Sequence, residues 1–64
     1  MDEKDISKFI SLILRHKPET IGITLVDGRT VGIGMVFFSA EGIVIESWIL
    51  GLYNTQRARG IVRE

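Results

Sequence analysis

The apolar side chains near the N-terminus recur at intervals of three and four residues, which places them on one side of an α-helix. They are Ile6, Phe9, Ile10, Ile13 and Leu14, with Leu12 on the flank of the stripe. Asp2 or Asp5 suits the start of this helix, because a carboxylate there accepts hydrogen bonds from free backbone N–H groups. Pro18 disfavours helical geometry at Lys17, so the pattern predicts a helix over residues 4–16.

Beyond this helix the pattern changes to runs of β-branched residues. Residues 21–26 and 30–38 are predicted strands, and the turn dipeptide Asp27-Gly28 separates them. Gly32 and Gly34 interrupt the second run, which is typical of a weakened strand or a bulge.

The C-terminal half gives weaker signals. Residues 39–42 predict a second turn, and residues 43–45 are apolar and β-branched. Residues 48–53 fit a strand or a helix face equally well, and residues 54–64 are mostly polar and basic. The whole pattern predicts the α+β class: one N-terminal amphipathic helix followed by two or three short strands, in an incomplete or small single domain.

Composition narrows the classes of function. A chain of 64 residues forms one domain at most, and without cysteine it has neither disulfides nor a cysteine-based zinc site, so no metal is expected. The formal net charge of zero argues against non-specific attraction to nucleic acid by the chain as a whole. No apolar run reaches the roughly 18 residues of a membrane helix, and acids follow Met1 where a signal peptide would be basic. A cytoplasmic protein is expected.

The basic cluster Arg15-His16-Lys17 is the main candidate for chemistry. Arginine offers a rigid fork of donors to phosphate oxygens, histidine can donate a further hydrogen bond, and lysine adds a mobile charge. The alternative is structural, because cations at the C-terminal end of a helix compensate its dipole. On these residues alone the structural role is favoured.

The other charged residues predict no site. The acids are scattered and are expected in turns and on the surface; they include Asp27, Glu41 and Glu46. Three C-terminal arginines could contact RNA phosphates, although a frayed basic tail is the favoured interpretation. They are Arg57, Arg59 and Arg63.

Residues 7–25 combine these features in a fixed register: S-K-F, then L-R-H-K-P-E, then I-G-I-T-L. This stretch closely resembles the N-terminal signature of the KptA/Tpt-type RNA 2'-phosphotransferases. That signature is S-K-F-L-S-x-x-L-R-H-x-P, followed by a segment like E-x-I-G-L-x-L-D. The resemblance covers about a third of the chain.

The resemblance implies a function. Members remove the internal 2'-phosphate left at a splice junction of RNA, such as tRNA, by transferring it to NAD as co-substrate. A first, winged-helix-like lobe handles the RNA, and a second lobe holds NAD. The resemblance implies that Arg15 is a catalytic residue that engages the RNA phosphate, with His16 and Lys17 beside it in the phosphate-binding site.

The chain departs from the family after Leu25. The family continues with Gly-Trp and a helix, whereas this chain has Val26-Asp27-Gly28-Arg29 and then a glycine-broken apolar run. Residues 1–25 are therefore expected to be the helix and first strand of the RNA-binding lobe, and residues 26–64 a divergent tail of uncertain fold. No counterpart of the NAD-binding lobe is recognised. We expect a truncated or frameshifted piece that lacks its C-terminal lobe and has no turnover alone.

Two alternatives remain open. The run L-V-D-G-R with the later Phe38 resembles the first motif of Sm-like RNA-binding proteins, although Ser39 replaces its aspartate and the Met-Asn pair is missing. That reading predicts a ring-forming protein without catalysis. A plain interaction piece is the other alternative, since the apolar runs 31–38 and 43–52 would need a partner to cover them.

Overall fold

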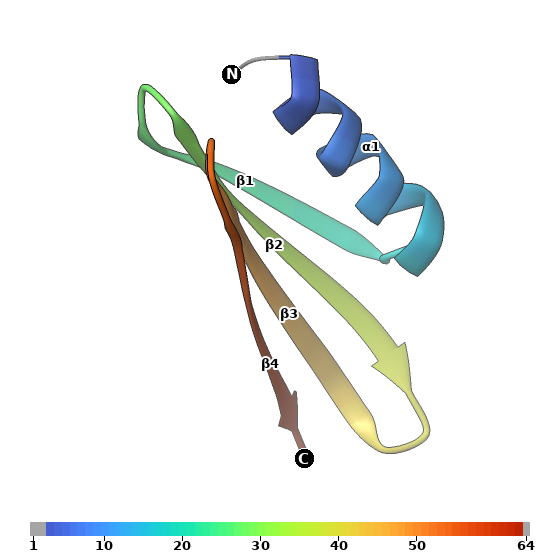
Figure 1. Ribbon diagram of the computed structural model, residues 1–64. Coiled ribbons are helices and arrows are strands. Elements are labelled where there is room, and N and C mark those ends of the chain that lie inside the picture. Colours follow the sequence, from blue (N-terminus) through green and yellow to red (C-terminus); the bar gives the residue numbers. More distant parts are fainter. Residues whose placement is uncertain (1–2, 64) are drawn as a thin grey trace.

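The computed structural model describes residues 3–63, which form one helix and a four-stranded sheet (Figure 1). The helix is α1 (Glu3–His16), and the strands are β1 (Thr20–Asp27), β2 (Thr30–Ser39), β3 (Gly42–Leu50) and β4 (Thr55–Val62). The strands form an antiparallel meander in the order β1-β2-β3-β4. The α+β class and the N-terminal helix are thus confirmed. The number of strands was underestimated, because the ambiguous segment extends β3 and the polar C-terminal segment forms β4.

The ends of α1 follow the charge pattern of the sequence. Acids occupy its first turn and Arg15 and His16 its last, as the helix dipole favours. Of the two predicted caps, Asp2 lies outside the described residues, and Asp5 lies within the helix. Lys17 leaves the helix with a positive φ of 47°, and its N–H donates to the carbonyl of Ile13 at 2.9 Å.

The side of α1 that faces the sheet differs from the prediction. Leu12, expected on the flank, is buried and packs with a core cluster of sheet residues, whereas Ile10 and Leu14 are 49% and 69% exposed. The side of α1 that meets the sheet instead carries Asp5 and Leu12, its two buried residues, and His16, whose Nδ1 atom lies 3.6 Å from Glu46 Oε2. The helical period shows which residues share a side, but not which edge of that side meets the sheet.

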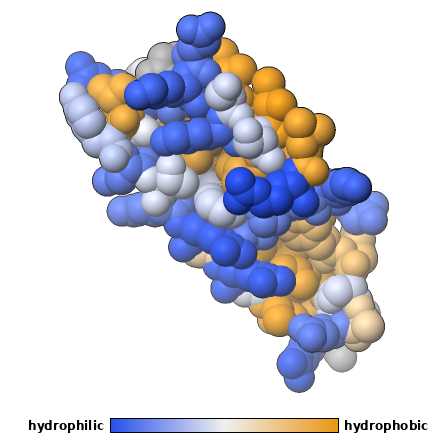
Figure 2. Space-filling model, turned by 45° about the vertical axis from the view of Figure 1, so that its right-hand side comes forward, coloured by the Kyte–Doolittle hydropathy of each residue, from blue (hydrophilic) through white to orange (hydrophobic). Residues whose placement is uncertain are grey.

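The core lies between α1 and the two central strands. Alternate residues of β2 and β3 are buried beneath the helix, and the most enclosed of them are Ile33, Met35 and Leu50. All residues of β1 and β4 are exposed, since α1 covers only the middle of the sheet. Figure 2 shows hydrophobic side chains that reach the surface on one side of the molecule, next to a band of polar ones.

The turn at Asp27-Gly28 is confirmed and has a definite cause. The Asp27 Oδ1 atom accepts hydrogen bonds from the backbone N–H groups of Arg29 at 2.7 Å and of Thr30 at 2.8 Å. The predicted irregularity at Gly32 and Gly34 is not seen between β2 and β3, which pair in continuous register. The register shift lies instead in β1, just before this turn.

Within residues 3–63 no helix is long and apolar enough to cross a membrane.

Candidate anion-binding groove

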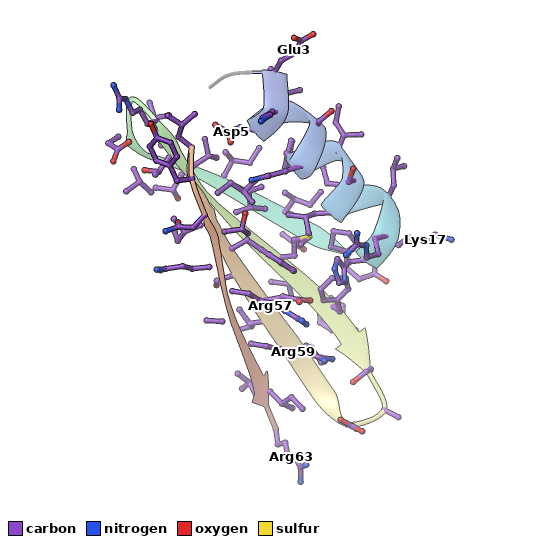
Figure 3. All side chains as sticks on the ribbon, in the orientation of Figure 1. Glu3, Asp5, Lys17, Arg57, Arg59 and Arg63 are labelled. Carbon is purple, nitrogen blue, oxygen red and sulfur yellow. The ribbon has the colours of Figure 1, made fainter. Side chains whose placement is uncertain are left out.

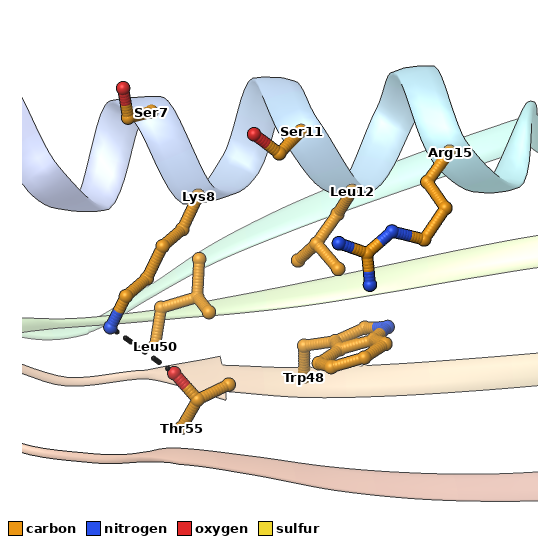
Figure 4. A pocket seen from close by; sticks show the side chains of 8 residues that line it. All are labelled: Ser7, Lys8, Ser11, Leu12, Arg15, Trp48, Leu50 and Thr55. Atoms are coloured by element: carbon orange, nitrogen blue, oxygen red, sulfur yellow. Dashed lines mark hydrogen bonds between the residues drawn. The ribbon is translucent and has the colours of Figure 1, made fainter.

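A groove runs between α1 and the strands β3 and β4 and encloses about 350 Å³ (Figure 4). The helix contributes its hydroxyl and cationic side chains, and the strands contribute an indole, an apolar floor and a hydroxyl. The residues that line it are Ser7, Lys8, Ser11, Leu12, Arg15, Trp48, Leu50 and Thr55. A concave site with an apolar floor and a few convergent polar groups is the usual form of a small-ligand site.

The two cations of the groove come from one side of the helix. Lys8 and Arg15 are seven residues apart, which is two helical turns, so their side chains lie along the same flank. Lys8 Nζ donates to Thr55 Oγ1 at 3.3 Å and thereby links α1 to β4. The Arg15 guanidinium points from the helix toward the ring of Trp48 (Figure 4). The groove thus holds two positive charges at separate ends.

Trp48 gives this groove a second kind of contact. Its indole forms part of the wall, and its Nε1–H is buried without a hydrogen-bond partner among the described residues. A buried donor without a partner costs about 1–3 kcal/mol relative to a paired one. An oxygen-bearing ligand that reached this N–H would recover part of that cost.

His16 does not line the groove, although it follows Arg15 directly. Its ring packs against Phe37 and Trp48, with centroids 6.0 Å and 5.8 Å away. Its Nδ1 atom lies 3.6 Å from Glu46 Oε2, which is too long for a hydrogen bond but close enough for an ion pair when the imidazole is protonated. The structure therefore places His16 inside the helix–sheet interface.

Lys17 lies neither in the groove nor in the helix–sheet interface. It follows the end of α1, is exposed, and points away from the sheet (Figure 3). The three consecutive residues of the predicted phosphate-binding set, Arg15, His16 and Lys17, thus take three directions, and only Arg15 lines the groove. In the groove, Arg15 is joined by Lys8 and Thr55, which the sequence did not single out. The seven-residue spacing of the two helical cations was the available signal for Lys8.

Glu46 and Arg57 form a second polar cluster on the covered face of the sheet. Glu46 is only 2% exposed and makes an ion pair with Arg57 of β4, whose guanidinium lies over the Trp48 ring at 5.1 Å from its centroid. Glu46 was expected on the surface and Arg57 in a frayed tail, and both expectations are wrong. The reason is long-range: β4 pairs with β3, which brings Arg57 beside a carboxylate that neighbouring residues do not predict.

The remaining acids of the described part of the chain do not cluster. Among residues 3–63 no three histidine or acidic side chains lie close enough together to hold a metal ion. Asp27 serves the first hairpin turn, where hydrogen bonds from the N–H of Arg29 and from Thr30 hold the pKa of its carboxyl below the ordinary value. Its role is therefore structural, as expected for an acid in a turn.

Comparison with known proteins supports a partial resemblance. A segment of 24 residues is 67% identical to the "Probable RNA 2'-phosphotransferase" of Pectobacterium carotovorum subsp. carotovorum (strain PC1). This segment covers 38% of the chain but only 13% of that protein. No protein-family model matches the chain, and no solved structure matches it significantly. The similarity to the RNA 2'-phosphotransferases is thus real over a short segment, and it does not extend to the rest of either protein.

Proposed function

We propose that this chain binds RNA through a phosphate group that the groove between α1 and β3–β4 holds, and that it derives this role from the RNA 2'-phosphotransferases. One observation carries the proposal: Arg15, the arginine of the L-R-H signature, is the member of the basic cluster that lines a groove. The short segment of 67% identity supports the family relationship.

The groove chemistry suits a phosphate. A guanidinium presents two parallel N–H donors to phosphate oxygens, and the Lys8 ammonium adds a second charge that can reach the same ligand from the other end. Ser7 and Ser11 also border the groove, although Figure 4 draws the Ser7 hydroxyl on the side of α1 away from the strands. Trp48 adds its Nε1–H, which has no partner among the described residues, as a further donor at the wall of the groove.

NAD fits the described residues less well than a single nucleotide does. The dinucleotide carries a diphosphate and two planar ring systems, whereas this groove has one indole within about 350 Å³. We therefore do not propose that these residues transfer the phosphate to NAD. Instead, the chain alone is proposed to bind the 2'-phosphorylated RNA without turning it over, as a piece that a second lobe would complete.

Binding of a short labelled oligonucleotide with one internal 2'-phosphate tests the proposal, with the same oligonucleotide lacking that phosphate as reference. The Arg15→Gln variant should bind the phosphorylated oligonucleotide at least about tenfold more weakly, since a charge-assisted bidentate contact is lost. Lys17→Gln is the matched control, because it removes a cation that points away from the groove. Equal losses in both variants would reduce the effect to net charge and contradict the assigned site.

Turnover is tested separately. We expect no release of nicotinamide when the chain is incubated with NAD and the 2'-phosphorylated oligonucleotide. Release above a buffer control would show that the chain completes the transfer by itself, and the binding-only role would then be wrong.

The Sm-like alternative has one structural observation in its favour. The D-G-R sequence does form the first hairpin turn of a meander that follows an N-terminal helix, and both edge strands, β1 and β4, are open. Pairing of β4 of one copy with β1 of the next would be a head-to-tail contact, the type that closes rings. A stable hexamer or heptamer in solution would favour this alternative over the groove-based function.

A further inference from the structure

The face of the sheet that points away from α1 contains no charged side chain. We call this face, formed by the alternate residues of 20–26, 32–38, 43–49 and 56–62, the open face. Cross-strand register assigns its members, because paired residues share a face. The charged residues of the two C-terminal strands, Glu46, Arg57 and Arg59, all lie on the opposite, helix-covered face (Figure 3).

Large apolar side chains are exposed along the open face. They come from all four strands and are between 37% and 65% exposed: Val26, Phe38, Ile45, Ile49 and Val62. Along the strands of an antiparallel sheet, apolar residues normally point toward the core and polar residues toward the solvent. A face with large apolar side chains on every strand and no charge is instead expected where a partner covers the sheet.

A row of small residues crosses the middle of the open face. Gly22 pairs with Gly34, Gly34 with Ser47, and Ser47 with Ala58, so the row spans all four strands. A Cβ atom added at Gly34 would meet no atom within 4 Å. Packing within the chain therefore does not require glycine there. Glycine inside a strand often marks a place where another backbone approaches closely.

We propose that the open face is the interface of a homodimer, in which two sheets pack face to face about a twofold axis. A twofold contact places the same patch on both copies, so the patch must tolerate itself. An uncharged face meets no repulsion from its own copy. The ends of the face carry charges of both signs, Glu41 with Arg63 at one end and Asp27 with Arg29 at the other, so neither end repels its counterpart.

The available area agrees with a dimer. Four strands of about nine residues, spaced about 4.8 Å apart and rising about 3.3 Å per residue, present roughly 570 Å² of sheet. Two such faces bury roughly 1,100 Å², which clears the roughly 1,000 Å² expected of a biological interface but lies below the standard size, so a weak, concentration-dependent dimer is expected. The dimer also gives a chain of only 64 residues the second core that its single helix cannot supply.

Sedimentation equilibrium tests the proposal on the full chain and two matched variants. The parent should have twice the 7.2 kDa mass of one chain. Ile45→Lys places a charge in the middle of the open face and should shift the mass to that of one chain. Ile10→Lys makes the same change at a similarly exposed position on α1 and should leave the dimer intact. A parent that is monomeric, a ring of six or seven copies, or dissociation by Ile10→Lys but not by Ile45→Lys would each overturn the proposal.

A second measurement does not depend on the folding of a charged variant. The chain has no cysteine, so a single thiol can be introduced at a chosen place. In Ser47→Cys the thiol lies in the middle of the open face, and its rate of alkylation should fall as the protein concentration rises. In Ser7→Cys the thiol lies on α1, and its rate should not change. Concentration-independent alkylation at both positions would contradict the dimer.

Discussion

Charged residues of a sheet usually lie on its exposed face, whereas in this protein they lie on the face that α1 covers. The middle of the face beneath α1 is buried and yet holds the carboxylate of Glu46 with Arg57 and His16 around it. The open face meets solvent in the single chain and yet has no charge. The covered face is thus held by one small apolar core and a polar cluster, and it also provides the groove. The open face supplies apolar surface that the chain does not itself use.

Removing one apolar side chain from each face tests this comparison most strongly. Leu12→Ala should lower the free energy of unfolding by about 3 kcal/mol, because it leaves a cavity beneath the helix. Ile49→Ala on the open face should cost about 1 kcal/mol or less in the single chain, since this side chain is already partly exposed. Urea unfolding in dilute protein measures both values. Equal losses would mean that both faces are buried to the same extent in one chain.

The polar cluster provides the second test. Arg57→Met removes the ion-pair partner of a buried carboxylate and should cost about 2 kcal/mol, a value reduced from that of a fully buried pair because Arg57 is 44% exposed. The double variant Glu46→Gln with Arg57→Met should recover part of that loss, since no charge is then left unpaired. If the double variant is as unstable as the sum of both single changes, the ion pair does not stabilise the covered face.

The smallest effect on stability is expected at the turn that connects β1 to β2. Hydrogen bonds from Arg29 and Thr30 lower the pKa of Asp27 in the folded chain. A lowered folded pKa means that this contribution to stability is present above the unfolded pKa and is lost as the pH falls through the folded one. Asp27→Asn should therefore lose less melting temperature than the parent between pH 5 and pH 2. An identical pH dependence would show that the Asp27 carboxylate does not stabilise the turn.

Local patterns predicted the elements whose causes are local. The three- and four-residue spacing, Pro18 and the Asp27-Gly28 dipeptide placed α1 and the first hairpin correctly. The strand over residues 55–62 was missed, because its sequence is polar and it forms by pairing with β3. The orientation of α1 was also missed, since it follows from the packing of Leu12 against residues of β2 and β3 that lie far away in the chain.

The candidate site was predictable only in part, for the same reason. Arg15 was singled out from its register with the signature, and the structure places it in a groove. Its companions Trp48 and Thr55 come from β3 and β4, and no spacing in the sequence connects them with α1. The apolar runs 31–38 and 43–52 led one alternative to expect a partner, which stays a prediction. Which of their residues share an uncharged face became visible only through the strand register.

Trp48 offers the most direct test of the proposed function, because it is the only tryptophan and lies in the wall of the groove. Its fluorescence can be titrated with a dinucleotide that carries a 2'-phosphate and with the same dinucleotide without it. The proposal predicts a saturable change in emission with the phosphorylated ligand, and loss of that change in Arg15→Gln. The same change with both ligands, or an undiminished change in Arg15→Gln, would contradict phosphate recognition by this groove.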